Sequence, residues 1–233
     1  YAYDDWAMAH LAAAAGAHDD AKALLVRSRN YRNQFDASTQ FMRPRNADGS
    51  WVTPFEPRAI GHMEKWRDFT EANAWQATFL TQHDLYAYME LFGGEKGLEA
   101  KLDALFTASS EMPPGSPPDI AGLVGQYAHG NEPCHHVAYL YAYCGAHHKT
   151  QAQVRMLLKS QYQAKPDGLS GNEDCGQMSA WYVMSALGLY PVDPVMGAYV
   201  FGSPLFPRAE IAVGQGRKLV IEAKGVAPDR FYI

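Results

Sequence analysis

Three segments of the sequence concentrate polar side chains beside the expected start of a helix. The first contains Glu71, with Trp75 four residues later; residues 129–136 read HGNEPCHH, and residues 171–181 read GNEDCGQMSAW. A carboxyl group beside an aromatic wall can have a raised pKa and then act as a general acid. These segments are the candidates for a catalytic or binding site.

Two carboxylates facing one another across a cleft are what glycoside hydrolysis requires. Glu71 and Asp174 are such a pair: one would protonate the leaving oxygen, and the other would activate a water or attack the sugar. Trp75 and Trp181 would suit the apolar faces of sugar rings. The same residues also fit a structural interpretation, with the acids capping helices and the tryptophans packed in the core. The residue types alone therefore indicate only a possible carbohydrate enzyme.

The same segments offer ligands for a metal ion. Asn131 and Glu132 present oxygen atoms, which suit a hard cation such as Ca²⁺. A zinc cage from the neighbouring histidines and Cys134 is the alternative. It is disfavoured because His135 and His136 are adjacent and would point to different faces of a helix.

The elements expected to position these segments are mostly helices. Apolar periodicity and helix-start residues predict helices near residues 4–15, 19–34, 71–91, 98–106, 135–144, 150–163 and 176–187. Short β-rich runs follow at residues 199–201, 210–213 and 219–221. The texture changes near residues 191–194, so residues 1–190 and 191–233 are expected to form separate parts.

Composition excludes several classes of protein. Hydrophobic residues make up 47% of the chain and charged residues 19%, which indicates a globular core. The net charge is −5 without a basic run, so no nucleic-acid partner is expected, and no apolar stretch is long enough to span a membrane. Three cysteines do not make a disulfide framework. The chain lacks an initiator Met and a signal peptide, and we expect it to be a fragment of a larger enzyme.

Several blocks together resemble glycoside hydrolase family 92, in the same order along the chain. They are YAYDDW at residue 1, FMRPRNADGSWVTPF at 41, EANAWQ at 71, HGNEPCHH at 129 and GNEDCGQMSAWYVMSALGLYPVDP at 171. The resemblance implies an exo-acting, inverting α-mannosidase that needs Ca²⁺. It also implies a mainly α fold, with residues 1–190 as later helices of an (α/α)6 barrel. Residues 191–233 would be a β-rich segment that packs on the barrel or begins a β-sandwich.

The resemblance also assigns roles to single residues. Glu71 falls at the position of the general acid, Asp174 at that of the general base, and Asn131 in the calcium loop. The residues expected to contact substrate are Trp75, His129, Glu132, Asn172 and Trp181, with His129 and Glu132 at the leaving sugar. Asn172 departs from members that carry a second Asp there, which leaves Asp174 as the base candidate.

The implied substrate is a mannose-containing glycan, with α-1,2-linked mannose of N-glycans or mannans favoured and a secreted or periplasmic location. Two rival functions stay open: a sugar-binding scaffold without turnover, and a glycosidase of another (α/α)6 family, since one fold hosts many activities.

Overall fold

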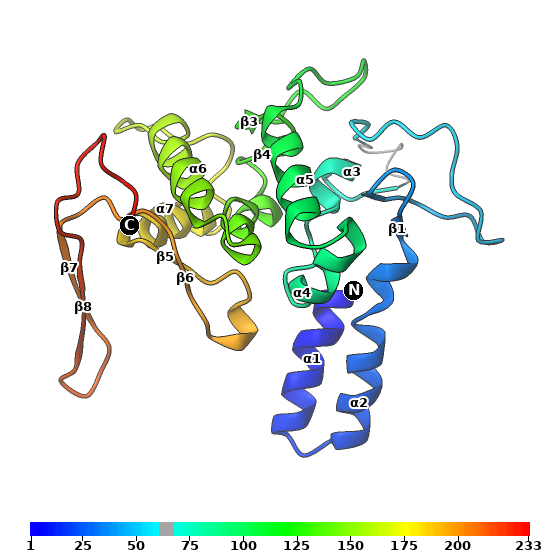
Figure 1. Cartoon of the computed structure of the whole chain (residues 1–233), viewed down its shortest axis with the longest axis horizontal. Helices are drawn as coiled ribbons and strands as arrows, with labels where there is room; N and C mark the ends of the chain where they lie inside the picture. Colours follow the sequence, from blue (N-terminus) through cyan, green and yellow to red (C-terminus); the bar gives the residue numbers. More distant parts are fainter. Residues whose placement is uncertain (61–67) are drawn as a thin grey trace.

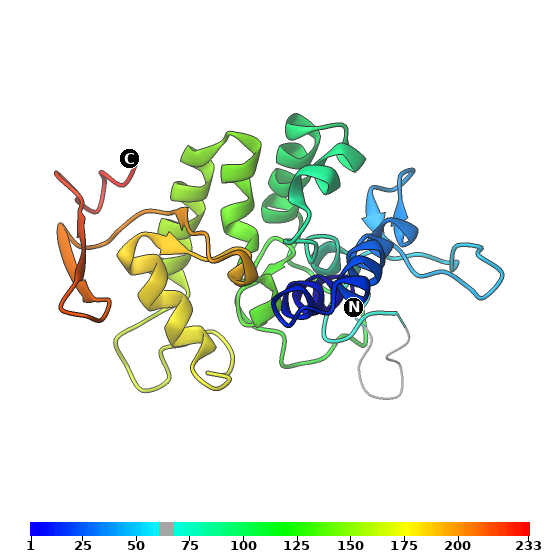
Figure 2. The same ribbon diagram turned by 90° about the horizontal axis from the view of Figure 1, so that it is seen from below.

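The structure is a computed structural model that describes residues 1–60 and 68–233, and it is mainly helical (Figures 1 and 2). The α-helices are α1 (Ala2–Ala14), α2 (His18–Arg27), α3 (Ala74–Ala77), α4 (Leu85–Met89), α5 (Glu95–Thr107), α6 (His147–Ser160) and α7 (Gln177–Leu187). The 3₁₀ helices are η1 (Asn30–Asn33), η3 (Glu90–Phe92), η4 (Glu132–Cys134), η5 (Val137–Cys144) and η6 (Pro194–Met196). The strands are β1 (Phe35–Asp36), β2 (Phe41–Met42), β3 (Leu123–Val124), β4 (Tyr127–Ala128), β5 (Leu189–Tyr190), β6 (Val200–Phe201), β7 (Arg208–Ala212) and β8 (Lys218–Glu222).

Helices α1 and α2 pack side by side as an antiparallel pair (Figures 1 and 2). The alanine-rich sequence of α1 has high helix propensity. Gly16 turns the chain with a φ of +80°, a conformation that a residue with a Cβ rarely adopts. A 3.0 Å ion pair between Arg27 Nη2 and Asp5 Oδ1 joins the two helices. The sequence predicted both helices, although α2 ends at Arg27 and not near residue 34.

A second helix pair, η5 and α6, packs against α5 through η5, and most side chains of η5 lie in the hydrophobic core. Leu98, Leu102, Leu105 and Phe106 of α5 are buried, as their spacing predicts. The expected α-helix near residues 135–144 is instead the 3₁₀ helix η5, which ends where Gly145 takes a left-handed φ of +70°. The helix pair is confirmed, but the winding of its first member was wrong.

The long helix expected over residues 71–91 is broken into α3, α4 and η3. The side chain of Asn73 accepts a 3.1 Å hydrogen bond from the Gln76 amide, so α3 starts only after Asn73. Between α3 and α4, His83 Nε2 bonds the Ser28 carbonyl at 2.9 Å and Asp84 accepts from Tyr31 at 2.8 Å. These tertiary hydrogen bonds hold the connection out of helical conformation.

The β-structure is short and antiparallel: β1 pairs with β2, β3 with β4, β5 with β6, and β7 with β8. The two longest strands, β7 and β8, lie near the C-terminus as expected, and Arg208 pairs with Glu222 at one end of their ladder. The segment between α7 and β7 packs on the helices. Tyr190 stacks on Tyr139 at 4.7 Å, and Asp193 accepts hydrogen bonds from Tyr3 and Trp6, both at 3.1 Å.

These elements confirm the expected fold class, a mainly α chain that forms part of an (α/α)6 barrel with short strands at the C-terminus. The separation into residues 1–190 and 191–233 stays a proposal. Strands β5 and β6 pair across that boundary and join the two parts. In the described part of the chain, every helix is too short or too polar to cross a bilayer.

Candidate active site

A cavity of about 320 Å³ brings together the three segments singled out in the sequence. Its lining includes Glu71 from the first segment, Asn131 and Glu132 from the second, and Asn172 and Asp174 from the third. Asn131 stands 60 residues after Glu71 and the third segment lies further still, so only the packing of the helices that carry these segments can place them at one cavity. The result is a pocket to which each of the three segments contributes a carboxylate.

The sequence did not single out two further polar residues that line this cavity, Gln76 and Asp119. Gln76 stands inside the EANAWQ block, next to residues that were considered. Asp119 follows the proline-rich stretch at residues 112–118 and gives no signal of its own.

The loop that carries Glu71 is fixed from two sides. Asn131 Nδ2 donates a 2.7 Å hydrogen bond to the Glu71 carbonyl. Two residues later, Asn73 caps α3 and donates through Nδ2 to Gln126 Oε1 at 2.9 Å. Glu71 itself has a φ of +52°, in the left-handed region. The structure therefore holds this acid in a defined position between the second segment and α3.

Glu132 begins η4 and lines the cavity together with the other acids. Burial raises the pKa of Glu132, and the nearby acids Asp174 and Glu71 raise that pKa further. Its Oε1 atom is buried and has no hydrogen-bond partner in the described residues. The three acids are thus close enough to influence one another, and Glu132 Oε1 is free to accept a hydrogen bond or to contact a cation.

Asp174 lies in a run of left-handed residues, Asp174, Cys175 and Gly176, with φ values of +48°, +57° and +93°. Glu173 folds over the start of α7 and accepts hydrogen bonds from the Ser179 amide and hydroxyl at 3.1 and 2.8 Å. The structural interpretation of Asp174 as the N-cap of α7 is therefore wrong, because Gly176 occupies that position. Glu173 serves the helix, while Asp174 lines the cavity.

His129 is fully buried behind the cavity, and its hydrogen bonds determine its tautomer. Tyr162 donates to the Met178 carbonyl at 3.1 Å, so its hydroxyl accepts from His129 Nε2 at 2.7 Å. His129 Nδ1 then accepts from Tyr127 at 2.8 Å. Burial lowers the pKa of His129 to about 3, which keeps the ring neutral.

His135 and Trp181 extend this buried network to α7. His135 Nε2 donates to the His129 carbonyl at 3.0 Å, and Gln177 donates to His135 Nδ1 at 3.2 Å. Trp181 is fully buried and donates to the His135 carbonyl at 2.9 Å. The expectation that His129 and Trp181 contact substrate directly is corrected: neither presents any surface, and both brace the second segment against the third.

Trp75 also lies away from the cavity lining. Its ring packs edge-on against Phe41, with centroids 4.8 Å apart, and lies near the ammonium group of Lys101. The expected aromatic wall therefore supports α3, the helix that follows Glu71.

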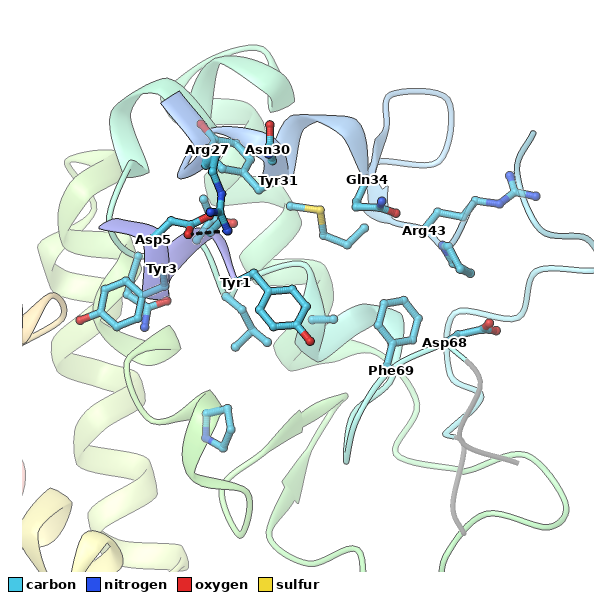
Figure 3. A pocket seen from close by; sticks show the side chains of 18 residues that line it. Tyr1, Tyr3, Asp5, Arg27, Asn30, Tyr31, Gln34, Arg43, Asp68 and Phe69 are labelled. Carbon is cyan, nitrogen blue, oxygen red and sulfur yellow. Dashed lines mark ion pairs between the residues drawn. The ribbon is translucent and has the colours of Figure 1, made fainter. Parts of the chain in front are cut away.

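A second, larger cavity of about 830 Å³ lies between the start of α1, the end of α2, η1 and residues 77–82 (Figure 3). The ion pair of Asp5 and Arg27 lies at its edge, and Tyr1 and Phe69 line it. None of the expected site residues lines it. The chemistry indicated by the sequence belongs to the smaller cavity.

The donors at the smaller cavity fit part of a calcium site. Asn131, Glu132, Asn172 and Asp174 offer carboxylate and amide oxygens, which Ca²⁺ prefers. Residues 1–60 and 68–233 contain no group of three acidic, histidine or cysteine side chains that could hold a metal alone. The oxygens present would therefore be a share of a coordination shell. Zinc fits less well, because both ring nitrogens of His135 are engaged in hydrogen bonds.

Carboxylates on loops between helices, gathered at one cavity, are the arrangement that glycoside hydrolases with an acid and a base use. The comparison with known families agrees. The model of the glycosyl hydrolase family 92 catalytic domain matches residues 1–233, and the chain belongs to this family.

Solved structures of the family superpose on the whole chain. The GH92 α-mannosidase BT3965 of Bacteroides thetaiotaomicron, in complex with mannoimidazole, matches with a TM-score of 0.91 and 38% identity over 100% of this chain and 31% of that one. The inverting GH92 mannosidase BT2199 of the same organism matches with a TM-score of 0.84 and 37% identity, over 100% and 32% of the two chains.

A curated relative is named an uncharacterized secreted glycosidase of Arthroderma benhamiae. It is 24% identical over a 230-residue alignment that covers 91% of this chain and 27% of the relative. The chain thus spans about a third or less of the length of the proteins it matches.

Proposed function

We propose that this chain carries the acid and the base of an exo-acting, inverting α-mannosidase. The observation that supports it most directly is the meeting of Glu71 and Asp174 at one cavity. The structural relatives described as α-mannosidases, one of them as inverting, point to the same substrate class.

In this proposal Glu71 protonates the departing glycosidic oxygen, and Asp174 takes a proton from the attacking water. The neutral form of Glu71 is the one that must donate its proton to the departing oxygen. The Asn131 hydrogen bond to the Glu71 carbonyl fixes the donor without using its carboxyl. Glu132 and Asn172 would bind sugar hydroxyls from the same cavity wall.

Calcium is the proposed cofactor, with Asn131 as a ligand and the neighbouring loop oxygens as further candidates. When bound, the ion supplies positive charge and orients sugar hydroxyls. The unpartnered, buried Oε1 of Glu132 supports a cation near this loop. We propose α-1,2-linked mannose of glycans as substrate, and a secreted or periplasmic location, in keeping with the name of the fungal relative.

The test is mannose release by the full-length protein from α-1,2, α-1,3 and α-1,6 mannobiose, with the anomer of the product followed by NMR. Glu71→Gln should slow disaccharides by about 10² to 10⁴-fold and activated aryl mannosides much less, because the latter depart without a proton. Asp174→Asn should slow both alike. Binding of mannobiose without release of mannose would instead identify a sugar-binding scaffold.

Dependence on calcium is tested by treatment with a chelator. Activity should disappear and return on addition of Ca²⁺ but not of Zn²⁺, because the donors at the cavity are oxygens. Full activity after exhaustive chelation would contradict the cofactor assignment and leave the acid and base assignment standing.

A further inference from the structure

Lys101 is a buried ammonium group without an ordinary partner. It lies on α5 among leucines, and only 8% of its surface is exposed. Within residues 1–60 and 68–233 it makes no ion pair and no hydrogen bond. Burial lowers its pKa to about 8, so the charged form prevails at neutral pH. An apolar side chain would fill this position without the cost of burying a charge.

Two aromatic rings take the place of a counter-ion. Lys101 Nζ lies 3.2 Å from the centroid of the Phe41 ring and 4.7 Å from that of Trp75. The two rings meet nearly at right angles, with an interplanar angle of 86°. A cation over aromatic faces is attracted by their quadrupoles, most strongly where water is excluded. The three side chains form a cage that links α5, β2 and α3.

This cage lies next to the loop of Glu71 in the chain. Trp75 is the second residue of α3, and Thr78 ties the same helix to β2 by accepting a 3.0 Å hydrogen bond from the Met42 amide. Glu71 stands two residues before Asn73, which caps α3. A shift of α3 away from α5 would therefore move the backbone that carries Glu71.

We propose that Lys101 is a positioning residue which, through its cation–π cage with Phe41 and Trp75, holds α3 and thereby sets the position of Glu71. The inference rests on the proposed function, in which Glu71 is the proton donor. Lys101 does not line the cavity, so its action is transmitted through Trp75.

The test is Lys101→Met in the full-length protein, with kcat and KM measured on a mannobiose and on an activated aryl α-mannoside. We expect kcat on the disaccharide to fall on the order of 10-fold, since small misplacements of a catalytic group have large effects. KM should stay nearly constant, and the aryl substrate should change less than about twofold because it needs no proton. The ratio of the two rates is independent of how much of the variant is folded.

Lys96→Met is the matched control, because Lys96 lies on the same helix and its side chain is exposed. It should leave both rates unchanged. Lys101→Arg keeps a cation over the rings and should restore most of the disaccharide rate. Equal losses on the two substrates in Lys101→Met, or an Arg variant no better than Met, would overturn the inference. A wild-type protein that hydrolyses neither substrate would instead refute the proposed function.

Discussion

At the scale of single residues, the two proposed catalytic acids share a left-handed backbone, with φ of +52° for Glu71 and +48° for Asp174. This conformation costs a residue with a Cβ roughly 1–2 kcal/mol. Residues in such conformations cluster at functional sites, where the surrounding structure holds them in place. Here the hydrogen bond of Asn131 to the Glu71 carbonyl supplies part of that hold.

The strain at Asp174 can be measured with a pair of variants that both lack the carboxyl. Asp174→Gly should be more stable than Asp174→Ala by about 1 kcal/mol, because only glycine adopts the left-handed conformation freely. Urea unfolding of both variants gives the difference. An Ala variant as stable as the Gly variant would show that this backbone is relaxed.

Buried neutral histidines should make the protein sensitive to acid. Burial lowers the pKa of His136 to about 4, and its Nε2 donates to the Phe79 carbonyl at 2.7 Å. The unfolded chain binds protons near pH 6.5 and the folded protein does not, so stability falls as the pH drops from about 6.5 toward 4. At pH 5 this histidine should cost about 2 kcal/mol. Thermal unfolding of His136→Gln should show a weaker dependence over this range; an unchanged dependence would exclude His136 as a source.

At the scale of elements, Lys101 opposes stability while it supports the position of α3. Its folded pKa of about 8 lies below the value of about 10.4 for an exposed lysine, so protonation favours the unfolded chain between these values. Lys101→Met should raise the free energy of unfolding at pH 7 by about 1 kcal/mol, after loss of the cation–π attraction. The gain should shrink as the pH rises from 8 to 10. A destabilised Met variant would show that the cage outweighs the buried charge.

Periodicity predicted α1, α2, α5, α6 and α7 because their apolar faces and terminal residues are local signals. It missed the break over residues 71–91, where the capping role of Asn73 and the contacts of His83 and Asp84 with a distant segment decide the conformation. The site loops were found through their polar composition. The burial of Trp181 could not be predicted in the same way, because a tryptophan beside a polar loop gives the same sequence signal whether it faces a cavity or the core.

At the scale of the whole molecule, the three thiols lie in different surroundings: Cys134 and Cys144 are buried, and Cys175 is exposed. We expect no disulfide among them. Alkylation of the denatured, unreduced protein should label all three of these cysteines, as measured by mass spectrometry of the peptides that carry them. A pair of these thiols protected from alkylation would contradict this, and a bridge from Cys134 to Cys175 would prove the second and third segments to be neighbours by an independent route.

The exposed Cys175 directly follows Asp174 in the chain. An environment-sensitive fluorophore attached to Cys175 would stand beside Asp174, which lines the smaller cavity. The buried thiols of Cys134 and Cys144 would react far more slowly. The emission of the fluorophore would then follow occupancy of the cavity by sugars in real time, without any turnover. The same thiol offers an anchor for mannose analogues that carry a mild electrophile, which would convert a weakly bound ligand into a durable label of this one loop.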